Sequence, residues 1–416
     1  MRRGFPARVA VFPVGRASAR QRRWKIPPTA IHQRRRPGEP GPPPGVEGMR
    51  GLYSRVMEPA THDPAPRPDL PAREDIRRIL IIKWSALGDV VLATAIMEDI
   101  FRAFPGRTID LNTLPSWVGL FRDDPRFREV FAFGVRGAQR AREMRRWLTH
   151  VAARRYDLIV DLQSTDRSRI LLGLLALRRR LPPWRIGNHR AIPYNFYPDA
   201  LPRPSHIHER MRSALRNAGI EPRTERPVLH IPAGNRARAA ALAAKHDLVA
   251  GDYAVLLPGC QAAGFLKRWG AEHYAELARG LHRKGLARVV LLGGPDEERE
   301  CRRIAELAGP CIADLCGATR IPDLVPLCEG ARVVVANDTG TAHVAAAAAR
   351  PLVLICGPTD PRRVRPIGPG VVTVQADLPC INCYRKTCPH HTCMRLVTPG
   401  RVLDAVTEAV SRTATA

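Results

Sequence analysis

Long apolar runs are missing from this 416-residue sequence, which has no stretch of about 18 or more uncharged apolar residues. A membrane-spanning helix is therefore not expected. Cysteine is missing from the first half of the chain, since all ten cysteines lie from Cys260 onward. A disulfide framework would not normally leave half of a chain empty, so this distribution favours a reducing compartment.

Several nucleotide and metal motifs are also absent. There is no G-x-x-x-x-G-K-[ST] and no G-x-G-x-x-G, so an ATPase and a dinucleotide-dependent oxidoreductase lose support. No Asp-x-Asp triplet occurs, so a metal ion that bridges a diphosphate has no evident ligands. The first 38 residues contain no Asp or Glu and resemble a transit peptide in composition, but they lack the apolar h-region of a secretory signal.

Acidic residues are few relative to basic ones, with 39 Asp and Glu against 66 Lys and Arg and a net charge of +27. The basic residues lie partly in the Arg/Pro-rich N-terminus and partly in residues 136–155. They do not form one clear patch with aromatic residues, as a nucleic-acid-binding surface would. A basic surface also suits anionic lipid headgroups or an acidic glycolipid. The charge therefore favours a membrane surface over specific nucleic-acid binding.

Residues 1–75 are rich in Arg and Pro and cannot bury a core, so we expect an Arg/Pro-rich disordered leader. Met49 and Met57 are both plausible true starts of the protein. Ordered structure is expected from Arg78 onward.

Apolar strands alternate with helices through the rest of the chain. We expect strands at 79–82, 108–114, 129–133, 156–162 and 184–187, with helices from Asp89 to about 104 and at 138–154. The pattern lapses at 222–237, a candidate linker. It restarts with strands at 253–257, 287–292, 333–335 and 351–355, and with helices at 270–282, after 298, from 341 to 349 and at 399–410. Such alternation predicts an α/β protein with parallel sheets in two Rossmann-like domains, residues 76–235 and 236–416, with a ligand cleft between them.

The stretch from Arg332 to His343 organises the second half. A β-branched run at 333–335 predicts a buried strand, and the turn at Asn337 to Gly340 leads into an alanine-rich helix. Glycine tolerates close approaches at such a turn. A strand that turns through glycine into a helix presents free N–H groups and a positive dipole end to an anion, although an ordinary capped turn has the same pattern.

Other loops follow strands at the same predicted edge, where ligands bind in open α/β sheets. They carry Lys267 and Arg268 for anionic oxygens and Glu297 for a ribose hydroxyl. Together with the turn at residues 338–340 they suit a nucleoside diphosphate. Each of these side chains alone is more often a solvated surface residue.

In the first half, the equivalent position is the loop 85–88 followed by Asp89. An acidic residue in the first turn of a helix commonly complements the helix dipole. The functional alternative is a general base, because a carboxylate on one side of a cleft can take a proton from an acceptor hydroxyl while the other side holds the leaving group.

Four of these segments resemble the lipopolysaccharide heptosyltransferases of glycosyltransferase family 9. They are residues 79–94 (ILIIKWSALGDVVLAT), 267–269 (KRW), 337–343 (NDTGTAH) and 357–361 (GPTDP), in the family's order between about 78 and 410. The resemblance implies a GT-B fold of two facing Rossmann-like domains. It also implies inverting, metal-independent transfer of a heptose from ADP-heptose to the lipopolysaccharide core, with no cofactor.

The resemblance assigns roles by position. Asp89 matches the family's proposed base, and Lys83, Ser85 and Gly88 belong to the acceptor-side loop. Lys267 matches a diphosphate-binding lysine and Glu297 a ribose-binding glutamate. The donor-binding turn is matched by the remaining residues, namely Asp338, Thr339, Gly340, Thr341 and His343. One departure concerns residues 261–266 (QAAGFL), which lack the hydroxyl residues that often precede the lysine.

The cysteines of the segment 380–393 have metal-ligand spacing, C-x2-C-x4-C-x4-C, with two histidines among them. Cys380, Cys383, Cys388 and Cys393 are therefore candidate zinc ligands. The alternative is that they have no metal role, because similar cysteine-rich tails occur in this family. A catalytic role for them is not expected.

The expected partners are ADP-heptose as donor and a lipid A-core acceptor, with peripheral association at the cytoplasmic face of the inner membrane and no specific nucleic acid. Two alternatives stay open at this point. One is a transferase for another nucleotide sugar, and the other is a zinc-knuckle-like nucleic-acid-binding protein whose RNA affinity depends steeply on salt.

Overall fold

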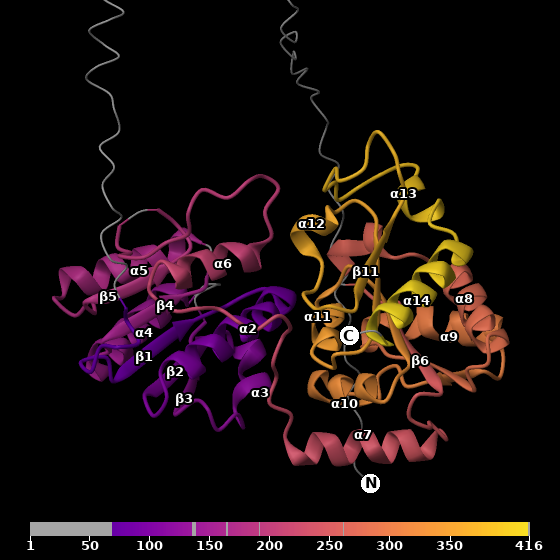
Figure 1. Ribbon diagram of the computed structural model, residues 1–416, viewed down its shortest axis with the longest axis horizontal. Helices are drawn as coiled ribbons and strands as arrows, with labels where there is room; N and C mark the ends of the chain where they lie inside the picture. The colour runs from indigo at the N-terminus through magenta and orange to yellow at the C-terminus, as the bar shows by residue number, and fades with distance from the viewer. Residues whose placement is uncertain (1–68, 135–138, 164, 191, 261, 415–416) are drawn as a thin grey trace, which may run out of the picture. The chain divides into compact units, whose positions relative to one another are not determined.

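The computed structural model describes residues 69–134, 139–163, 165–190, 192–260 and 262–414 (Figure 1). Residues 1–68 of the predicted leader lie outside this range. Within residues 69–75 the prediction of disorder is wrong, because Leu70 is fully buried and its N–H donates to the carbonyl oxygen of Ala218 at 3.2 Å. A single apolar residue among prolines gives no periodic signal, so the pattern could not identify it.

The first half of the described chain forms a five-stranded parallel sheet in the order β3-β2-β1-β4-β5. Its strands are β1 (Arg78–Ile82), β2 (Thr108–Thr113), β3 (Glu129–Ala132), β4 (Leu158–Asp161) and β5 (Trp184–Gly187). The helices that accompany it are α2 (Leu87–Ala103), η1 (Pro115–Trp117), α3 (Val118–Phe121), α4 (Arg140–Arg154), α5 (Asp166–Leu177) and α6 (Ile207–Arg216).

The second half forms a six-stranded parallel sheet in the order β11-β10-β9-β6-β7-β8. Its strands are β6 (Tyr253–Leu257), β7 (Arg288–Leu291), β8 (Ile312–Asp314), β9 (Val333–Asn337), β10 (Leu352–Cys356) and β11 (Val371–Gln375). The longer helices are α7 (Ala233–Lys245), α8 (Ala271–Arg283), α9 (Glu298–Ala308), α10 (Leu324–Glu329), α11 (Gly340–Ala346) and α14 (Pro399–Ala414). The short turns are η2 (Ala262–Lys267), η3 (Pro295–Glu297), η4 (Ile321–Asp323), α12 (Pro361–Val364) and α13 (Thr392–Arg395).

The central strands are buried along nearly their whole length, as parallel strands covered on both faces must be. Every residue of β6, β9 and β10 is buried, and in β1 only Arg78 is exposed. This explains why the continuous apolar runs at 79–82, 253–257 and 333–335 predicted these strands correctly. The predicted α/β class with two parallel sheets is confirmed.

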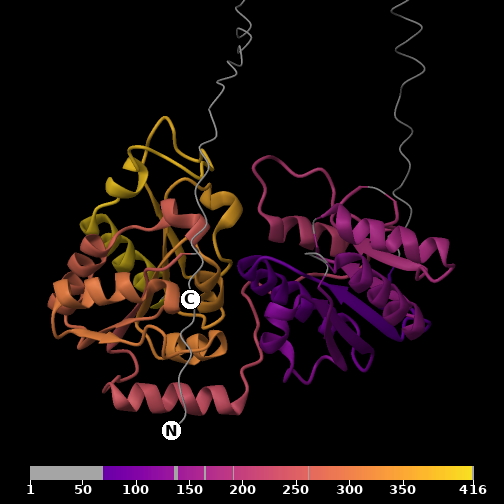
Figure 2. The same ribbon diagram turned by 180° about the vertical axis from the view of Figure 1, so that it is seen from behind.

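The last five residues of the predicted linker at 222–237 are helical instead. Helix α7 begins at Ala233 and packs against α10, and both views show it running past that helix (Figures 1 and 2). Only Ala239 of α7 is buried, so the helix lacks a strong apolar stripe, and most of its residues are charged or small. The division of the chain at residues 235–236 stays a prediction. None of the described helices is both long and apolar enough to cross a membrane.

Candidate active site

Each sheet has one point where the strand order reverses, and ligands bind at such points, beyond the carboxyl ends of the strands. In the first sheet this point lies between β1 and β4, so the loop after β1 leads directly to α2 and Asp89. In the second sheet it lies between β6 and β9. The loops there are the segment before Lys267 and the turn that begins at Asp338. Topology therefore selects the segments that the sequence motifs had singled out.

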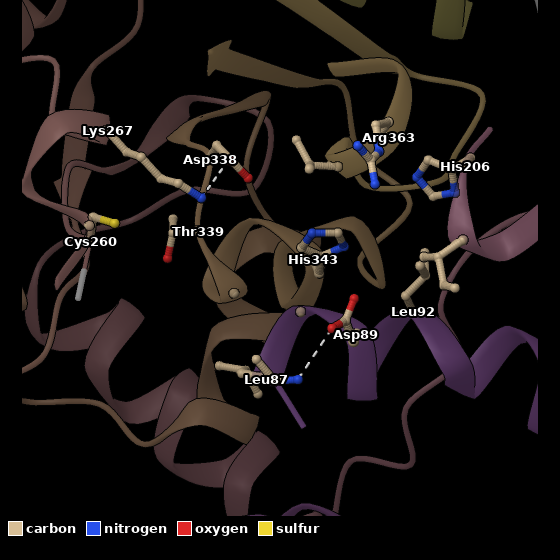
Figure 3. Close-up of a pocket in the computed structure, with 16 residues that line it drawn as sticks. Leu87, Asp89, Leu92, His206, Cys260, Lys267, Asp338, Thr339, His343 and Arg363 are labelled. Carbon is tan, nitrogen blue, oxygen red and sulfur yellow. Dashed lines mark hydrogen bonds and ion pairs between the residues drawn. The ribbon is translucent and has the colours of Figure 1, made fainter. Parts of the chain in front are cut away.

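These segments line one cavity of 370 Å³ (Figure 3). Its walls come from both halves of the chain. The predicted residues among its lining are Gly88, Asp89, Lys267, Asp338, Thr339, Gly340 and His343. The structure thus brings together the side chain predicted to act as a base and most of those predicted to hold the donor.

Asp89 is an exposed carboxylate at the third residue of α2. Its Oδ2 accepts a hydrogen bond of 3.3 Å from the N–H of Ala86, which caps the helix. The capping role and a place on the cavity wall coexist, because a carboxylate has further lone pairs to offer. The two interpretations of this residue from the sequence are therefore compatible in the geometry.

The other predicted residues of the acceptor-side loop lie at different depths. Lys83 is only 2% exposed, and its Nζ donates to the carbonyl oxygen of Leu162 at 3.2 Å. Burial lowers the pKa of Lys83, while the nearby carboxylates of Asp89 and Asp161 oppose that shift. Ser85 is half-buried, and its N–H points to Gln163 Oε1 at 3.3 Å. Neither Lys83 nor Ser85 lines the cavity. Their hydrogen bonds to Leu162 and Gln163 instead fix the loop that precedes α2.

Helix α2 and helix α11 approach each other closely at their first turns. A Cβ at Gly88 would lie 2.8 Å from Cδ2 of His343, and one at Gly340 would lie 2.9 Å from Cβ of Leu87. Glycine is needed here for close approach. The N-cap of α11, Thr339, makes no side-chain capping bond, so no side chain accepts a hydrogen bond from the first N–H groups of that helix as a cap.

Asp338 joins two of the predicted loops. Its Oδ2 accepts hydrogen bonds from Lys267 Nζ at 2.7 Å and from Thr359 Oγ1 at 2.7 Å, and it is 5% exposed. Lys267 is half-buried, so its ammonium can still reach the cavity (Figure 3). A buried carboxylate that accepts two hydrogen bonds has little freedom to move. It therefore holds the lysine in place at the cavity wall.

Glu297 and Thr341 line a second cavity of 270 Å³, which shares Leu87, Cys260, Thr339 and Gly340 with the first. The two cavities therefore adjoin. Oε2 of Glu297 accepts the N–H of Gly294 at 2.7 Å, which fixes the glutamate at the start of η3. Arg268, expected to face anionic oxygens beside Lys267, does not line either cavity. Its guanidinium bonds to Glu300 at 2.8 Å and to the carbonyl oxygen of Cys260 at 2.8 Å.

Two histidines lie at the junction of the two halves. His343 is buried, and burial lowers its pKa to about 4, against the opposing charges of Asp338 and Asp89. Its Nδ1 has no hydrogen-bond partner among the described residues. Nε2 of His206 donates to the carbonyl oxygen of Arg365 at 2.9 Å, and Nδ1 accepts the N–H of His208 at 3.2 Å. Burial lowers the pKa of His206 too, so both imidazoles are neutral at neutral pH.

Sequence reasoning missed His206, Arg363 and Thr359. His206 and Arg363 line the first cavity (Figure 3). His206 precedes a short helix and Arg363 lies in one, α12, so neither is part of a strand-to-helix turn that pattern analysis can recognise. Thr359 lies inside the quoted segment 357–361, and that position was the available signal for it.

The comparisons with known proteins decide the family. The model of glycosyltransferase family 9 (heptosyltransferase) matches residues 144–394, which is more than half of the chain. The chain belongs to glycosyltransferase family 9. This match confirms the sequence resemblance to family 9. The protein is therefore a glycosyltransferase, and the alternative of a nucleic-acid-binding protein is not supported.

Curated relatives of this glycosyltransferase agree along most of their length. Lipopolysaccharide heptosyltransferase 1 of Pseudomonas aeruginosa is 27% identical over 328 residues, which cover 75% of this chain and 88% of the relative. Lipooligosaccharide heptosyltransferase 2 of Haemophilus influenzae is 25% identical over 350 residues, covering 80% of this chain and 99% of the relative.

Solved structures confirm the GT-B fold. A family 9 glycosyltransferase from Veillonella parvula has a TM-score of 0.67 at 18% identity, with 83% of this chain and 98% of that chain covered. The ADP-heptose lipopolysaccharide heptosyltransferase II of Escherichia coli has a TM-score of 0.61 at 24% identity, with 81% and 99% covered. At these identities the likeness concerns the fold.

Proposed function

We propose that this glycosyltransferase moves a heptose from ADP-heptose to the inner core of lipopolysaccharide, with inversion at the anomeric carbon and without a metal ion. The observation that carries the proposal is the single 370 Å³ cavity that Asp89 shares with Lys267 and Asp338. It supports an acceptor on the side of the first sheet and a donor on the side of the second.

On the donor side, the adjoining 270 Å³ cavity suits the nucleoside. Glu297 would accept a ribose hydroxyl there. The diphosphate would then lie at Lys267 and the uncapped start of α11, and Oδ1 of Asp338 would accept a sugar hydroxyl. In support, the heptosyltransferase of E. coli with the same fold has been solved with ADP and with ADP-2-deoxy-2-fluoro heptose.

The proposed reaction is a single displacement. Asp89 takes the proton from an acceptor hydroxyl, and that oxygen attacks the anomeric carbon while the bond from this carbon to the diphosphate oxygen breaks. ADP leaves toward the opposite wall. Attack and departure on opposite faces of the sugar invert the anomeric configuration.

The leaving diphosphate needs positive charge as its own negative charge develops. Lys267 and the first backbone N–H groups of α11 would supply this stabilisation, since helix N-termini attract anions. Asp338 and Thr359 would keep the lysine oriented before the donor arrives. This arrangement supports a reaction that needs no bridging metal ion.

The acceptor would be a lipid A-core glycolipid, which requires peripheral association at the cytoplasmic face of the inner membrane. The basic composition of the chain, with a net charge of +27, suits a phosphorylated acceptor and anionic lipids.

The experiment that tests this function combines a binding screen with one variant. ADP and ADP-heptose should raise the melting temperature of the protein more than UDP, GDP or CDP and their sugars do, because ligands that bind the native state stabilise it. Lys267→Ala should weaken ADP binding about 10- to 100-fold, the loss of one charge-assisted hydrogen bond of about 1.5–3 kcal/mol. Isothermal titration calorimetry measures this loss.

Lys284→Ala, at the exposed end of α8, is the matched control and should bind ADP as the unmodified protein does. Selective stabilisation by another nucleotide sugar would replace the donor in this proposal with that sugar. Unchanged ADP affinity in Lys267→Ala would remove the lysine from the donor site.

A further inference from the structure

The segment 377–393, which follows β11 and includes the start of α13, is held in a defined conformation without a core of its own. None of its residues is buried, and Tyr384 is 45% exposed. It contains no strand and only the first residues of one short helix. Ordering a chain costs conformational entropy that buried apolar surface usually offsets. Leu378 and Cys393 pack against the core of the second half but stay partly exposed, so hydrophobic burial stabilises this loop only weakly.

Four cysteines of the loop converge on one place. Cys380, Cys383, Cys388 and Cys393 all line a small cavity of 20 Å³, apart from the two cavities of the candidate active site. All four are free thiols, so no disulfide provides the missing stabilisation. Their spacing, C-x2-C-x4-C-x4-C, is that of short metal-binding loops.

The two histidines at this cavity have other partners. Nδ1 of His390 lies 2.8 Å from Thr392 Oγ1, and Nε2 of His391 lies 2.7 Å from the carbonyl oxygen of Leu266. Each of these bonds engages one ring nitrogen, and the four sulfur atoms are the ligand set that shares one chemistry.

The backbone turns tightly after two of these cysteines. The N–H groups of His390 and His391 donate to the sulfur of Cys388. The backbone is left-handed at Asn382 (φ 61°) and His391 (φ 46°), two residues after Cys380 and three after Cys388. A tight turn therefore follows each of these two cysteines, and at Cys388 backbone N–H groups are also directed at the sulfur.

We propose that these four cysteines bind one Zn²⁺ ion in a tetrahedral, purely structural site. Binding replaces the thiol protons, which are released to solvent, and closes the loop on the ion. The sulfurs must draw together for this. The only group of three potential ligands in the described chain whose atoms already lie within 4.8 Å of one another is Cys301, Asp314 and Cys316.

That second group is the weaker candidate. It offers two sulfurs and one carboxylate, and Cys316 Sγ already points to the carbonyl oxygen of Gly294 at 3.3 Å. Cys301 is fully buried in the core, where a thiol packs as a small apolar group. This group needs no ion for its stability, and it supplies the control variants for the test.

A zinc ion in the loop would brace the candidate donor site from outside. Tyr384 donates its N–H to the carbonyl oxygen of Pro358 at 2.9 Å, and its hydroxyl accepts the N–H of Asp360 at 3.2 Å. His391 holds the carbonyl oxygen of Leu266, the neighbour of Lys267. The ion would therefore fix two loops whose side chains meet at Asp338, and it would take no part in the chemical step.

The test uses the full-length protein, purified without chelators and analysed by inductively coupled plasma mass spectrometry. We expect about one zinc per chain. Cys383→Ser and Cys388→Ser should each lose most of it, whereas Cys301→Ser and Cys316→Ser should keep it. X-ray absorption on the unmodified protein should give four sulfur neighbours at about 2.3 Å from zinc. This measurement stands even if a variant fails to fold.

A chelator should lower the melting temperature of the unmodified protein and leave that of the Cys388→Ser variant unchanged. The proposal is overturned if the protein neither contains zinc nor takes up added Zn²⁺. It is equally overturned if zinc is lost from Cys316→Ser and retained in Cys388→Ser, or if absorption shows fewer than four sulfur neighbours.

Discussion

At the scale of single residues, the cavity combines opposite charges with neutral imidazoles. Asp89 and Asp338 bring two carboxylates, Lys267 brings an ammonium, and His343 lies among them, buried and with its pKa lowered. Protonation of His343 would put a second cation beside the Lys267 ammonium, at a buried place where the desolvation penalty is large. His343 therefore works as an uncharged side chain that separates the two carboxylates.

His343 gives a prediction about stability and pH. Its pKa is about 4 in the folded protein and near 6.5 in the unfolded chain, so the unfolded chain binds more protons between these values. Stability should therefore fall as the pH drops from about 6.5 toward 4. His343→Gln should lose this part of the pH dependence. Urea unfolding at several pH values measures it.

Asp161 is a titrating group with the opposite sign, because burial raises its pKa to about 6. Asp161→Asn should retain the dependence that His343 causes, which makes it the control. If His343→Gln and the unmodified protein show parallel stability curves between pH 4 and 6.5, the imidazole is not held neutral by the fold.

The sequence could identify the cavity residues that lie at strand-to-helix turns, since backbone topology alone brings those turns together. It could not indicate the depth of Lys83, whose neighbours resemble those of an exposed loop residue. Nor could it show that Arg268 turns away from the cavity. That orientation depends on Glu297 of η3 and Glu300 of α9, two acids on other elements.

At the scale of elements, the site depends on the contact between α2 and α11. The two helices meet through the two glycines at their starts, Gly88 and Gly340. Each glycine leaves room for a side chain of the other helix. The helices belong to different sheets, so this contact also sets the position of Asp89 relative to Asp338.

Gly88→Ala tests this contact. The added methyl group would lie 2.8 Å from the ring of His343, so the ring or the helix must move. We expect a loss of about 1–3 kcal/mol in stability, typical of an overpacked contact, together with a lower turnover rate. Urea unfolding and a turnover assay measure the two effects.

Gly173→Ala is the matched control, because Gly173 lies within helix α5 and has nothing within 4 Å of the added atom. It should leave activity unchanged and stabilise the protein by about 0.5–1 kcal/mol. A Gly88→Ala variant as stable and active as Gly173→Ala would show that α2 and α11 do not need to touch.

Most strands were predictable from their apolar runs, including the edge strands β3 and β5 of the first sheet. Strands β8 and β11 lie at the two edges of the second sheet and were not expected from the sequence. Strand β8 is three residues long with one buried residue, which gives too short a run for a pattern. The start of helix α7 was assigned to a linker because its small and charged residues give no periodic apolar pattern. Its packing against α10 stabilises it as a helix.

At the scale of the whole molecule, the proposed lipid acceptor requires a surface that meets a membrane. Helix α5 exposes Ile170 by 56% and Leu177 by 81%, and a spacing of seven residues puts both on one face. Three exposed arginines follow, Arg178 to Arg180. Exposed apolar side chains beside a basic cluster suit an interface with anionic lipid.

Leu177→Glu should reduce binding to vesicles that contain phosphatidylglycerol by about tenfold, since an apolar side chain loses its contact and a negative charge is added. Vesicle co-sedimentation measures this at two salt concentrations. Val249→Glu, at a residue 65% exposed in the second half, is the control and should bind as the unmodified protein does. Equal losses in both variants would argue against α5 as the lipid-binding surface.

The most direct measurement is the turnover of Asp89→Asn with ADP-heptose and a lipid A-core acceptor, beside its affinity for ADP. Asp166→Asn, at an acid in the first turn of α5, controls for the loss of a negative charge at the start of a helix. The account predicts that Asp89→Asn lowers kcat by about 10²- to 10⁴-fold while the Kd for ADP changes little, and that Asp166→Asn changes neither. Turnover of Asp89→Asn within a few-fold of the unmodified enzyme would contradict the account, because the carboxylate would then not be the base.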